Sequence, residues 1–349
     1  LITFLSMTSS LRLLAKGTFL FCVLALLACG LVLAWFASWR ADRLAALDSA
    51  SEVAKTDLGP VEFLTRGEGP AVLVFHGAPG GYDQAMLLSS SFVEGDFQIV
   101  APSRPGYLRT PLATGLSPEQ QADAMAALID QLGISRVAIL ASSSGAPAAV
   151  QFVLRYPAKV WALVLLAAVA GKFDPDAKPQ RLEPGRIVLN GFGSDLGSWI
   201  CLEATERNPA RTLSWILKAQ NSGTEDQREA LENHVLGDLD QLEWFESFVG
   251  TFVPLSAREA GLRNDLAQIR ALMDLPLEAV RVPTLVVHGT ADRCVPIENA
   301  QEVAGRIPGA VLYPVEGAGH LVEIGPWVPE LQKKIVEFLR QHSAGQAQP

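Results

Sequence analysis

The sequence predicts an α/β fold with a mostly parallel central sheet, an inserted helical region and an apolar N-terminal helix. From residue 59 onward, short apolar runs alternate with longer amphipathic segments, and this alternation stops over residues 171–277. Buried strands that alternate with crossover helices are typical of parallel sheets. An uncharged apolar stretch at residues 17–39 adds the N-terminal helix.

The N-terminal stretch of residues 17–39 is long enough to cross a membrane. It contains no charged residue and no proline, and at about 1.5 Å per residue a helix of this length exceeds the roughly 30 Å bilayer core. Basic residues flank it on both sides, and aromatic residues gather at its far end, as in an interfacial belt. We expect a single-pass membrane anchor, with residues 1–16 as a tail and 40–58 as a stalk. Two basic residues on each side leave its orientation open.

Two alternatives to an anchor are a secreted form with a cleaved signal and a lipoprotein. A signal peptide has a short apolar core that ends in small residues, whereas this one is long and ends in Trp35 and Phe36. Residues 26–29 (LLAC) resemble a lipoprotein signal with Cys29 as the lipidated residue, but the residues after Cys29 remain apolar. The anchor is therefore the favoured interpretation. Because the chain starts with a leucine, Met7 is a candidate start of translation.

Strands and helices can be assigned along the rest of the chain from apolar runs and capping signals. We expect strands at residues 61–64, 71–75, 97–102, 137–140, 160–165, 283–288 and 311–313. A helix should begin after Ser117, because Pro118 and Gln120 complete a capping box, and others should cover 145–156, 298–307 and 328–341. These elements define a core of residues 59–170 and 278–342, interrupted by a helical cap at 171–277.

Composition limits the function classes. The 349 residues are 49% hydrophobic and 19% charged, which is typical of a globular protein. A net charge of -9 argues against nucleic acid as a partner, because phosphate binding needs a basic face. Four cysteines without a CxxC pair, and five histidines without an HExxH pattern, do not support a metal site, so we expect no metal and no cofactor. The oligomeric state is not indicated.

The strongest chemical signal is the segment ASSSG at residues 141–145, between a strand and a helix. A strand–turn–helix of this kind is the nucleophile elbow, whose strained turn needs small residues two before and two after the nucleophile. Centring the turn on Ser143 puts Ala141 and Gly145 at those positions, whereas centring it on Ser144 leaves the glycine unused. We therefore predict Ser143 as the nucleophile.

A serine nucleophile needs a base, and five histidines are available. His76 and His288 each end a strand as His-Gly, where a ring often braces a loop, while His234 lies in the predicted cap and His342 in the tail. His320 follows the last strand in a glycine-rich loop, where small residues let the imidazole reach the elbow. We predict His320 as the general base.

An acid must orient that imidazole and stabilise its charged form. Asp292 lies just past the carboxyl end of a predicted buried strand, where ligand sites of open α/β sheets form. Asp174 or Asp176, beyond the strand at 160–165, is the alternative acid.

An oxyanion hole is expected where the strand at 71–75 ends in HGAPGG. Two backbone N–H groups should hold the tetrahedral oxyanion: that of Ser144, after the nucleophile, and one from this loop. Pro79 has no N–H, so Ala78 is the expected donor. A phosphate-binding loop is the alternative, but the Gly-Lys-Ser/Thr ending is missing.

From residue 59 to its end the chain resembles the α/β-hydrolase superfamily, in its lidded serine hydrolase branch. The motifs HGAPGG, SRPGY, ASSSGAP, HGTAD and GAGH carry the resemblance, and the chain order serine, aspartate, histidine is the order of that fold. HGAPGG is similar to the HGGPGG of proline iminopeptidases, whose elbow usually has an aromatic residue where this chain has Ser144. Epoxide hydrolases and haloalkane dehalogenases use an aspartate nucleophile, so Ser143 argues against both. Ala141 replaces the usual first glycine of the elbow.

The residues and the resemblance together predict acyl transfer to water by a membrane-anchored serine hydrolase. The expected substrate is a small-molecule or lipid-like ester; hydrolysis of an amide, a peptide or a carbon–carbon bond uses the same triad and is the alternative. A non-catalytic binding protein on the same fold is the rival from a different class. Four aromatic residues of the predicted cap are candidates to line the substrate pocket, or else to form the core of the cap: Trp199, Trp215, Trp244 and Phe245.

Overall fold

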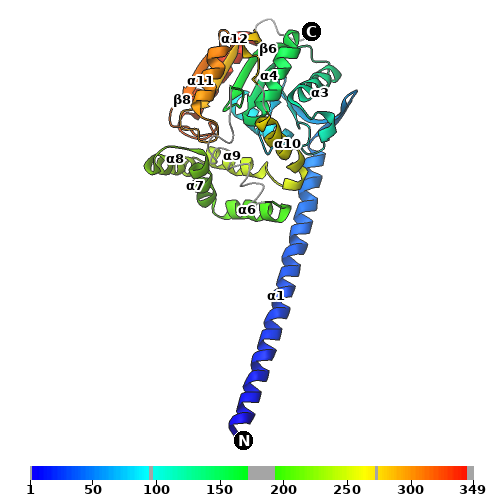
Figure 1. Cartoon of the computed structure of the whole chain (residues 1–349), viewed down its shortest axis with the longest axis vertical. Helices are drawn as coiled ribbons and strands as arrows, with labels where there is room; N and C mark the ends of the chain where they lie inside the picture. The colour runs from blue at the N-terminus through cyan, green and yellow to red at the C-terminus, as the bar shows by residue number, and fades with distance from the viewer. Residues whose placement is uncertain (1, 94–96, 172–192, 272–273, 344–349) are drawn as a thin grey trace. The chain divides into compact units, whose positions relative to one another are not determined.

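A computed structural model describes residues 2–93, 97–171, 193–271 and 274–343 (Figure 1). The chain divides into two compact units, one that ends at Ala46 and one that begins at Leu47. The described residues of the first unit lie within a single helix, α1 (Ile2–Ser49), whose part from Leu14 onward is long and apolar enough to cross a membrane. A signal sequence near an N-terminus can meet the same requirement of length and apolar composition.

The second unit contains one mixed, mostly parallel sheet, which confirms the predicted fold class. Its strand order is β1-β2-β4-β3-β5-β6-β7-β8, with β1 and β2 antiparallel to their neighbours and all later pairs parallel. The strands are β1 (Glu52–Thr56), β2 (Gly59–Arg66), β3 (Ala71–Phe75), β4 (Gln98–Pro102), β5 (Val137–Ser142), β6 (Val160–Leu166), β7 (Thr284–Gly289) and β8 (Val311–Val315).

Helices cover both faces of this sheet. Alternate side chains of each strand point to opposite sides, and the apolar side chains on each side are buried against helices. In β3, Leu73 and Phe75 pack into one apolar cluster, together with α3 (Pro118–Gln131), α4 (Ala146–Arg155) and α11 (Ile297–Arg306). The intervening residues Val72 and Val74 pack into the other, with α2 (Tyr82–Val93) and α12 (Val328–Ser343). The uninterrupted apolar runs of the central strands follow from burial on both faces.

The start of the sheet differs from the prediction. We expected a stalk up to residue 58 and a first strand near Val61, but β1 already pairs antiparallel with β2 along Glu52–Thr56. The expectation was wrong because β1 is a short edge strand with only Val53 and Ala54 as apolar residues. Such a strand is stabilised by pairing with its neighbour, which its own composition does not reveal. The helix predicted after Ser117 is confirmed, with the full capping box.

Between β6 and β7 the described residues form helices and no strand of the central sheet. They are α6 (Asp195–Arg207), α7 (Pro209–Gln220), α8 (Glu225–Gly237), α9 (Leu239–Gly250) and α10 (Glu259–Arg270). Side chains of α7, α8 and α9 share an apolar core, to which Leu321 and Ile324 also belong. The helices α6 to α10 lie within the predicted cap, residues 171–277.

Candidate active site

The turn between β5 and α4 has the geometry of a nucleophile elbow centred on Ser143. The φ of Ser143 is +49°, in the left-handed region that a serine rarely adopts and that is found at strained functional turns. A Cβ on Gly145 would lie 2.6 Å from the carbonyl oxygens of Phe75 and His76, so only glycine fits against the adjacent backbone. This backbone favours Ser143 over Ser144 as the exposed centre of the turn.

The structure brings the three predicted triad residues into one hydrogen-bonded chain. His320 Nε2 lies 2.9 Å from Ser143 Oγ, and His320 Nδ1 lies 2.8 Å from Asp292 Oδ2. These side chains come from the ends of β5, β7 and β8, whose carboxyl ends meet at the same edge of the sheet. The alternative acids Asp174 and Asp176 lie outside the described residues.

Asp292 is held in the form that an orienting acid needs. Its Oδ1 accepts backbone N–H bonds from Cys294 and Val295, at 2.8 and 2.9 Å, and His288 Nε2 lies 3.2 Å from its Oδ2. Burial disfavours the charged carboxylate, but the charge of His320 and hydrogen bonds from the two histidines outweigh it and lower the pKa of Asp292 to about 2. Asp292 is therefore an anion at neutral pH.

His320 is a stronger base than an ordinary histidine. Burial lowers the pKa of its imidazole, but the charge of Asp292 and the hydrogen bond to it have the larger combined effect, so the pKa lies above 6.5. The charge of Glu323 adds to the increase.

Glu323 was missed in the sequence. It is only 4% exposed, and its Oε2 makes no hydrogen bond within the part of the chain that the structure describes. Burial raises the pKa of this carboxyl group to about 7, although backbone hydrogen bonds and the charge of His320 lower it. A carboxylate in the otherwise apolar run LVEIG, three residues after His320, was the available signal.

The loop that was predicted to supply an oxyanion donor lies beside the elbow. A Cβ on Gly77, the residue before Ala78, would lie 3.4 Å from the Cβ of Ser143. Ala78 and Ser144 therefore belong to neighbouring backbone segments. Their role as oxyanion donors stays a prediction.

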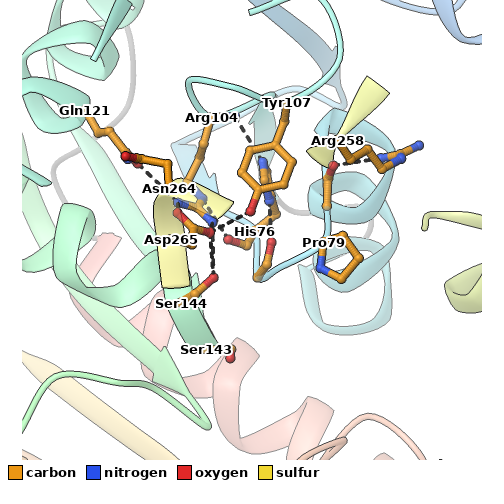
Figure 2. Close-up of polar contacts among 12 residues, drawn as sticks. His76, Pro79, Arg104, Tyr107, Gln121, Ser143, Ser144, Arg258, Asn264 and Asp265 are labelled. Carbon is orange, nitrogen blue, oxygen red and sulfur yellow. Dashed lines mark hydrogen bonds and ion pairs between the residues drawn. The ribbon is translucent and has the colours of Figure 1, made fainter. Parts of the chain in front are cut away.

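The side chain of Ser144 lies in a buried polar cluster that the sequence did not reveal (Figure 2). Its Oγ donates to Asp265 Oδ2 at 2.9 Å and accepts from Arg104 Nη2 at 3.2 Å. Arg104 belongs to the SRPGY motif, which was noted without a role, and nothing in the sequence around Asp265 indicated one.

The four aromatic candidates for the pocket have different surroundings. Trp215 helps to line a mostly apolar pocket among α6, α7 and α9, whose wall also includes Gln220. The carbonyl of Gln220 accepts the backbone N–H of His320 at 3.4 Å, so the pocket wall reaches the loop that carries His320. The other three have different neighbours: Trp199 is buried in α6, Phe245 packs in the core of the helices, and Trp244 stacks on Phe248 with ring centroids 5.2 Å apart. A substrate-binding role for the four stays a prediction.

One cluster of described side chains could in principle hold a metal ion. The ligating atoms of Asp292, Cys294 and His320 lie within 4.8 Å of one another. However, the carboxylate and the imidazole already bond to each other. Burial, with the charge of Asp292, raises the pKa of the Cys294 thiol well above its usual value, whereas metals bind the thiolate. The cluster fits a hydrogen-bonded triad better than a metal site.

Comparisons with known proteins agree with this architecture. The model of the alpha/beta hydrolase family matches residues 71–327, a range that includes Ser143, Asp292 and His320. An uncharacterized hydrolase, YcgS of Bacillus subtilis (strain 168), is 28% identical over 290 residues, which cover 81% of this chain and 96% of that protein. The 2-hydroxy-6-oxononadienedioate/2-hydroxy-6-oxononatrienedioate hydrolase of Burkholderia vietnamiensis is 25% identical over 278 residues, covering 78% of this chain and 87% of that enzyme.

Among solved structures, an alpha/beta hydrolase fold protein from Nakamurella multipartita is similar over almost its full length. It superposes with a TM-score of 0.74 at 30% identity and covers 83% of this chain and 99% of that one.

Proposed function

Because this chain belongs to the alpha/beta hydrolase family, we propose that it is a serine hydrolase that transfers an acyl group to water through Ser143, His320 and Asp292. The observation that carries the proposal is the continuous hydrogen-bonded chain from Asp292 Oδ2 through the His320 ring to Ser143 Oγ, with steps of 2.8 and 2.9 Å. Both distances are within the range expected for a nucleophile, its base and the group that orients the base.

The mechanism follows from which atoms of the triad carry a proton. Asp292 accepts from His320 Nδ1–H, which leaves the lone pair of Nε2 facing Ser143 Oγ. As Ser143 attacks the substrate carbonyl, Nε2 takes its proton, and the resulting imidazolium is stabilised by the charge of Asp292. The N–H groups of Ala78 and Ser144 would hold the oxyanion. His320 then protonates the leaving group, which departs. In the second half, His320 takes a proton from a water molecule as the water attacks the acyl carbonyl, and it returns that proton to Ser143 Oγ as the bond between the serine and the acyl group breaks.

An ester is the substrate class that we favour, with a small-molecule or lipid-like acyl group. The apolar pocket lined by Trp215 and Phe248 supports an apolar substituent. A carbon–carbon bond is the second candidate, because the substrate in the name of the Burkholderia relative is a ketone with two carboxylates and no ester or amide. Hydrolysis of such a compound must break a bond between two carbons.

We also propose that the helices between β6 and β7 form a cap over the substrate and that residues 17–39 anchor the enzyme in a membrane. The five helices α6 to α10, with the apolar core that α7, α8 and α9 share, support the cap. The length and apolar composition of α1 support the anchor, with a secreted form or a lipoprotein as the alternatives.

The test of the function is covalent labelling of the full chain, in detergent, with a fluorophosphonate probe, combined with a panel of p-nitrophenyl esters. We expect Ser143→Ala to lose labelling and to reduce ester turnover by a factor of about 10⁴ or more, as in other serine hydrolases that lose the nucleophile. Ser144→Ala should still label. If Ser144→Ala loses labelling and Ser143→Ala retains it, the assignment of the nucleophile is wrong by one residue.

A further inference from the structure

A buried ion pair between Arg104 and Asp265 joins three parts of the chain beside the active site (Figure 2). The two residues are only 1% and 3% exposed, and their side chains form two parallel bonds, Nη1 to Oδ1 at 2.9 Å and Nη2 to Oδ2. Removing two charges from water is costly, so a buried ion pair is weak evidence of a purely stabilising role. The contacts of this pair beside Ser144 point to a functional role.

The Asp265 carboxylate restrains the residue after the nucleophile. Besides the arginine, its Oδ2 accepts hydrogen bonds from Ser144 Oγ at 2.9 Å and from Tyr107 OH at 2.6 Å. Arg104 Nη2 also donates to Ser144 Oγ, at 3.2 Å. With its side chain held from two directions, Ser144 has little freedom to rotate, and its backbone N–H is one of the two proposed oxyanion donors.

Arg104 also holds the loop that would supply the other donor. Its Nε–H donates to the carbonyl of His76 at 2.9 Å, and its backbone N–H donates to His76 Nε2 at 3.0 Å. Since Nε2 accepts, the ring proton is on Nδ1, which donates to the carbonyl of Gly77 at 2.7 Å. Burial and the charge of Arg104 lower the pKa of His76 well below its usual value, so this bracing ring stays neutral. Gly77 directly precedes Ala78.

Asp265 reaches the elbow only because α10 packs closely on the loop that follows β4. The N–H of Gly261 donates to the carbonyl of Gly106 at 2.8 Å, and the N–H of Leu108 donates to the carbonyl of Ala257 at 2.6 Å. The φ of Gly106 is +91°, and a Cβ there would lie 2.6 Å from the nitrogen of Gly261. The position of Asp265 is therefore coupled to the docking of α10, a helix of the predicted cap.

We propose that Arg104 and Asp265 are positioning residues that hold the backbone N–H groups of Ala78 and Ser144 where both can bind the same oxyanion. The active site is then complete only when α10 is docked. The inference rests on the proposed function. It also explains the pairing of charges: an isolated carboxylate beside Ser144 would repel the developing oxyanion, and the guanidinium cancels that charge. The two residues act through Ser144 and His76 and do not touch the substrate.

The experiment compares Asp265→Asn with wild type as full-length protein in detergent, with active sites counted by fluorophosphonate titration. Asparagine keeps the shape but removes the charge and one acceptor. We expect kcat for a p-nitrophenyl ester to fall about 10- to 100-fold while KM changes less than about twofold, because a misplaced oxyanion donor affects the transition state. Affinity for a trifluoromethyl ketone, which binds as a tetrahedral oxyanion, should fall by the same factor as kcat.

A double variant separates positioning from stability. Arg104→Met with Asp265→Leu replaces the buried charges by apolar side chains, a change that can preserve or increase stability. Tm is measured alongside, because Tyr107 OH, Ser144 Oγ and the His76 carbonyl lose partners in this variant. At a temperature where the variant is fully folded, we expect kcat per titrated active site to stay at least about 10-fold lower than that of wild type. The matched control is Asp123→Asn, which breaks the two-bond pair with Arg155 between α3 and α4, away from the elbow, and should leave kcat unchanged.

Unchanged kcat and ketone affinity in Asp265→Asn, or in the double variant, would overturn the inference. If neither yields active protein, Ser144→Ala, which keeps both charges, decides: a parallel loss of about 3- to 10-fold in kcat and ketone affinity supports the inference, and no loss in either overturns it. Failure of the proposed function would look different, since Ser143→Ala would then remain active. An inactive Ser143→Ala combined with a fully active Asp265→Asn would reject the positioning role alone.

Discussion

Replacing Asp292 with asparagine should move the ring proton of His320 from Nδ1 to Nε2. The geometry determines how the new amide must sit. Oδ1 accepts two backbone N–H bonds, from Cys294 and Val295, so the amide oxygen has to take that place. The NH₂ group then replaces Oδ2, 2.8 Å from His320 Nδ1, and donates to it. With Nδ1 as an acceptor, the ring proton moves to Nε2 and points at Ser143 Oγ.

The size of the effect follows from this tautomer. A base whose reactive nitrogen already carries a proton cannot accept another, so kcat should fall by a factor of about 10⁴, which is about 5 kcal/mol of transition-state stabilisation. The pH dependence should change as well. The base must be unprotonated, so kcat/KM of the wild type rises with pH through a midpoint above 6.5. Without the charge of Asp292, burial dominates, and the midpoint should move to lower pH.

The assay is hydrolysis of a p-nitrophenyl ester between pH 5 and 9, with kcat referred to the concentration of folded protein. Circular dichroism serves as a control that the variant is folded, and Asp123→Asn controls for the loss of a carboxylate elsewhere. A variant that keeps kcat within tenfold of the wild type, or whose midpoint does not decrease, would refute the assignment of Asp292 as the orienting acid.

Three further outcomes can be checked independently. Gly145→Ala should lower the free energy of unfolding by about 1–3 kcal/mol because its Cβ would lie 2.6 Å from two carbonyl oxygens. Gly305→Ala should not, since a Cβ there would have no neighbouring atom of the described residues within 4 Å; urea denaturation measures both. The folded-state pKa of Glu323 is raised from 4.5 to about 7, so stability should fall by about 3 kcal/mol as pH rises through that window; Glu323→Gln should abolish this loss, and an unchanged pH dependence would contradict the assignment. Removing residues 1–40 should move active enzyme from the membrane to the soluble fraction; a natural N-terminus at a lipidated Cys29, or at or beyond Ser38, would exclude the anchor.

Sequence reasoning succeeded where a short segment carries its own physical constraint. Burial on both faces makes β3 and β6 uninterrupted apolar runs, and the capping box at Ser117 marks the start of a helix by hydrogen bonds made locally. It failed for β1, because an edge strand with two apolar residues is stabilised by its partner. For Trp199, Trp215, Trp244 and Phe245, no local feature of the sequence distinguishes a residue that lines a pocket from one that packs in the apolar core.

The amino-acid sequence by itself determined that Ser143, Asp292 and His320 would be the candidate triad. Each follows a strand, and the carboxyl ends of parallel strands lie along one edge of the sheet, so their meeting is a consequence of the fold class. The tertiary structure alone decided that Arg104 would pair with Asp265, 161 residues later in the chain. That pairing depends on how α10 packs on the loop after β4, and such docking is set by the fit of two surfaces, which local periodicity and spacing do not encode.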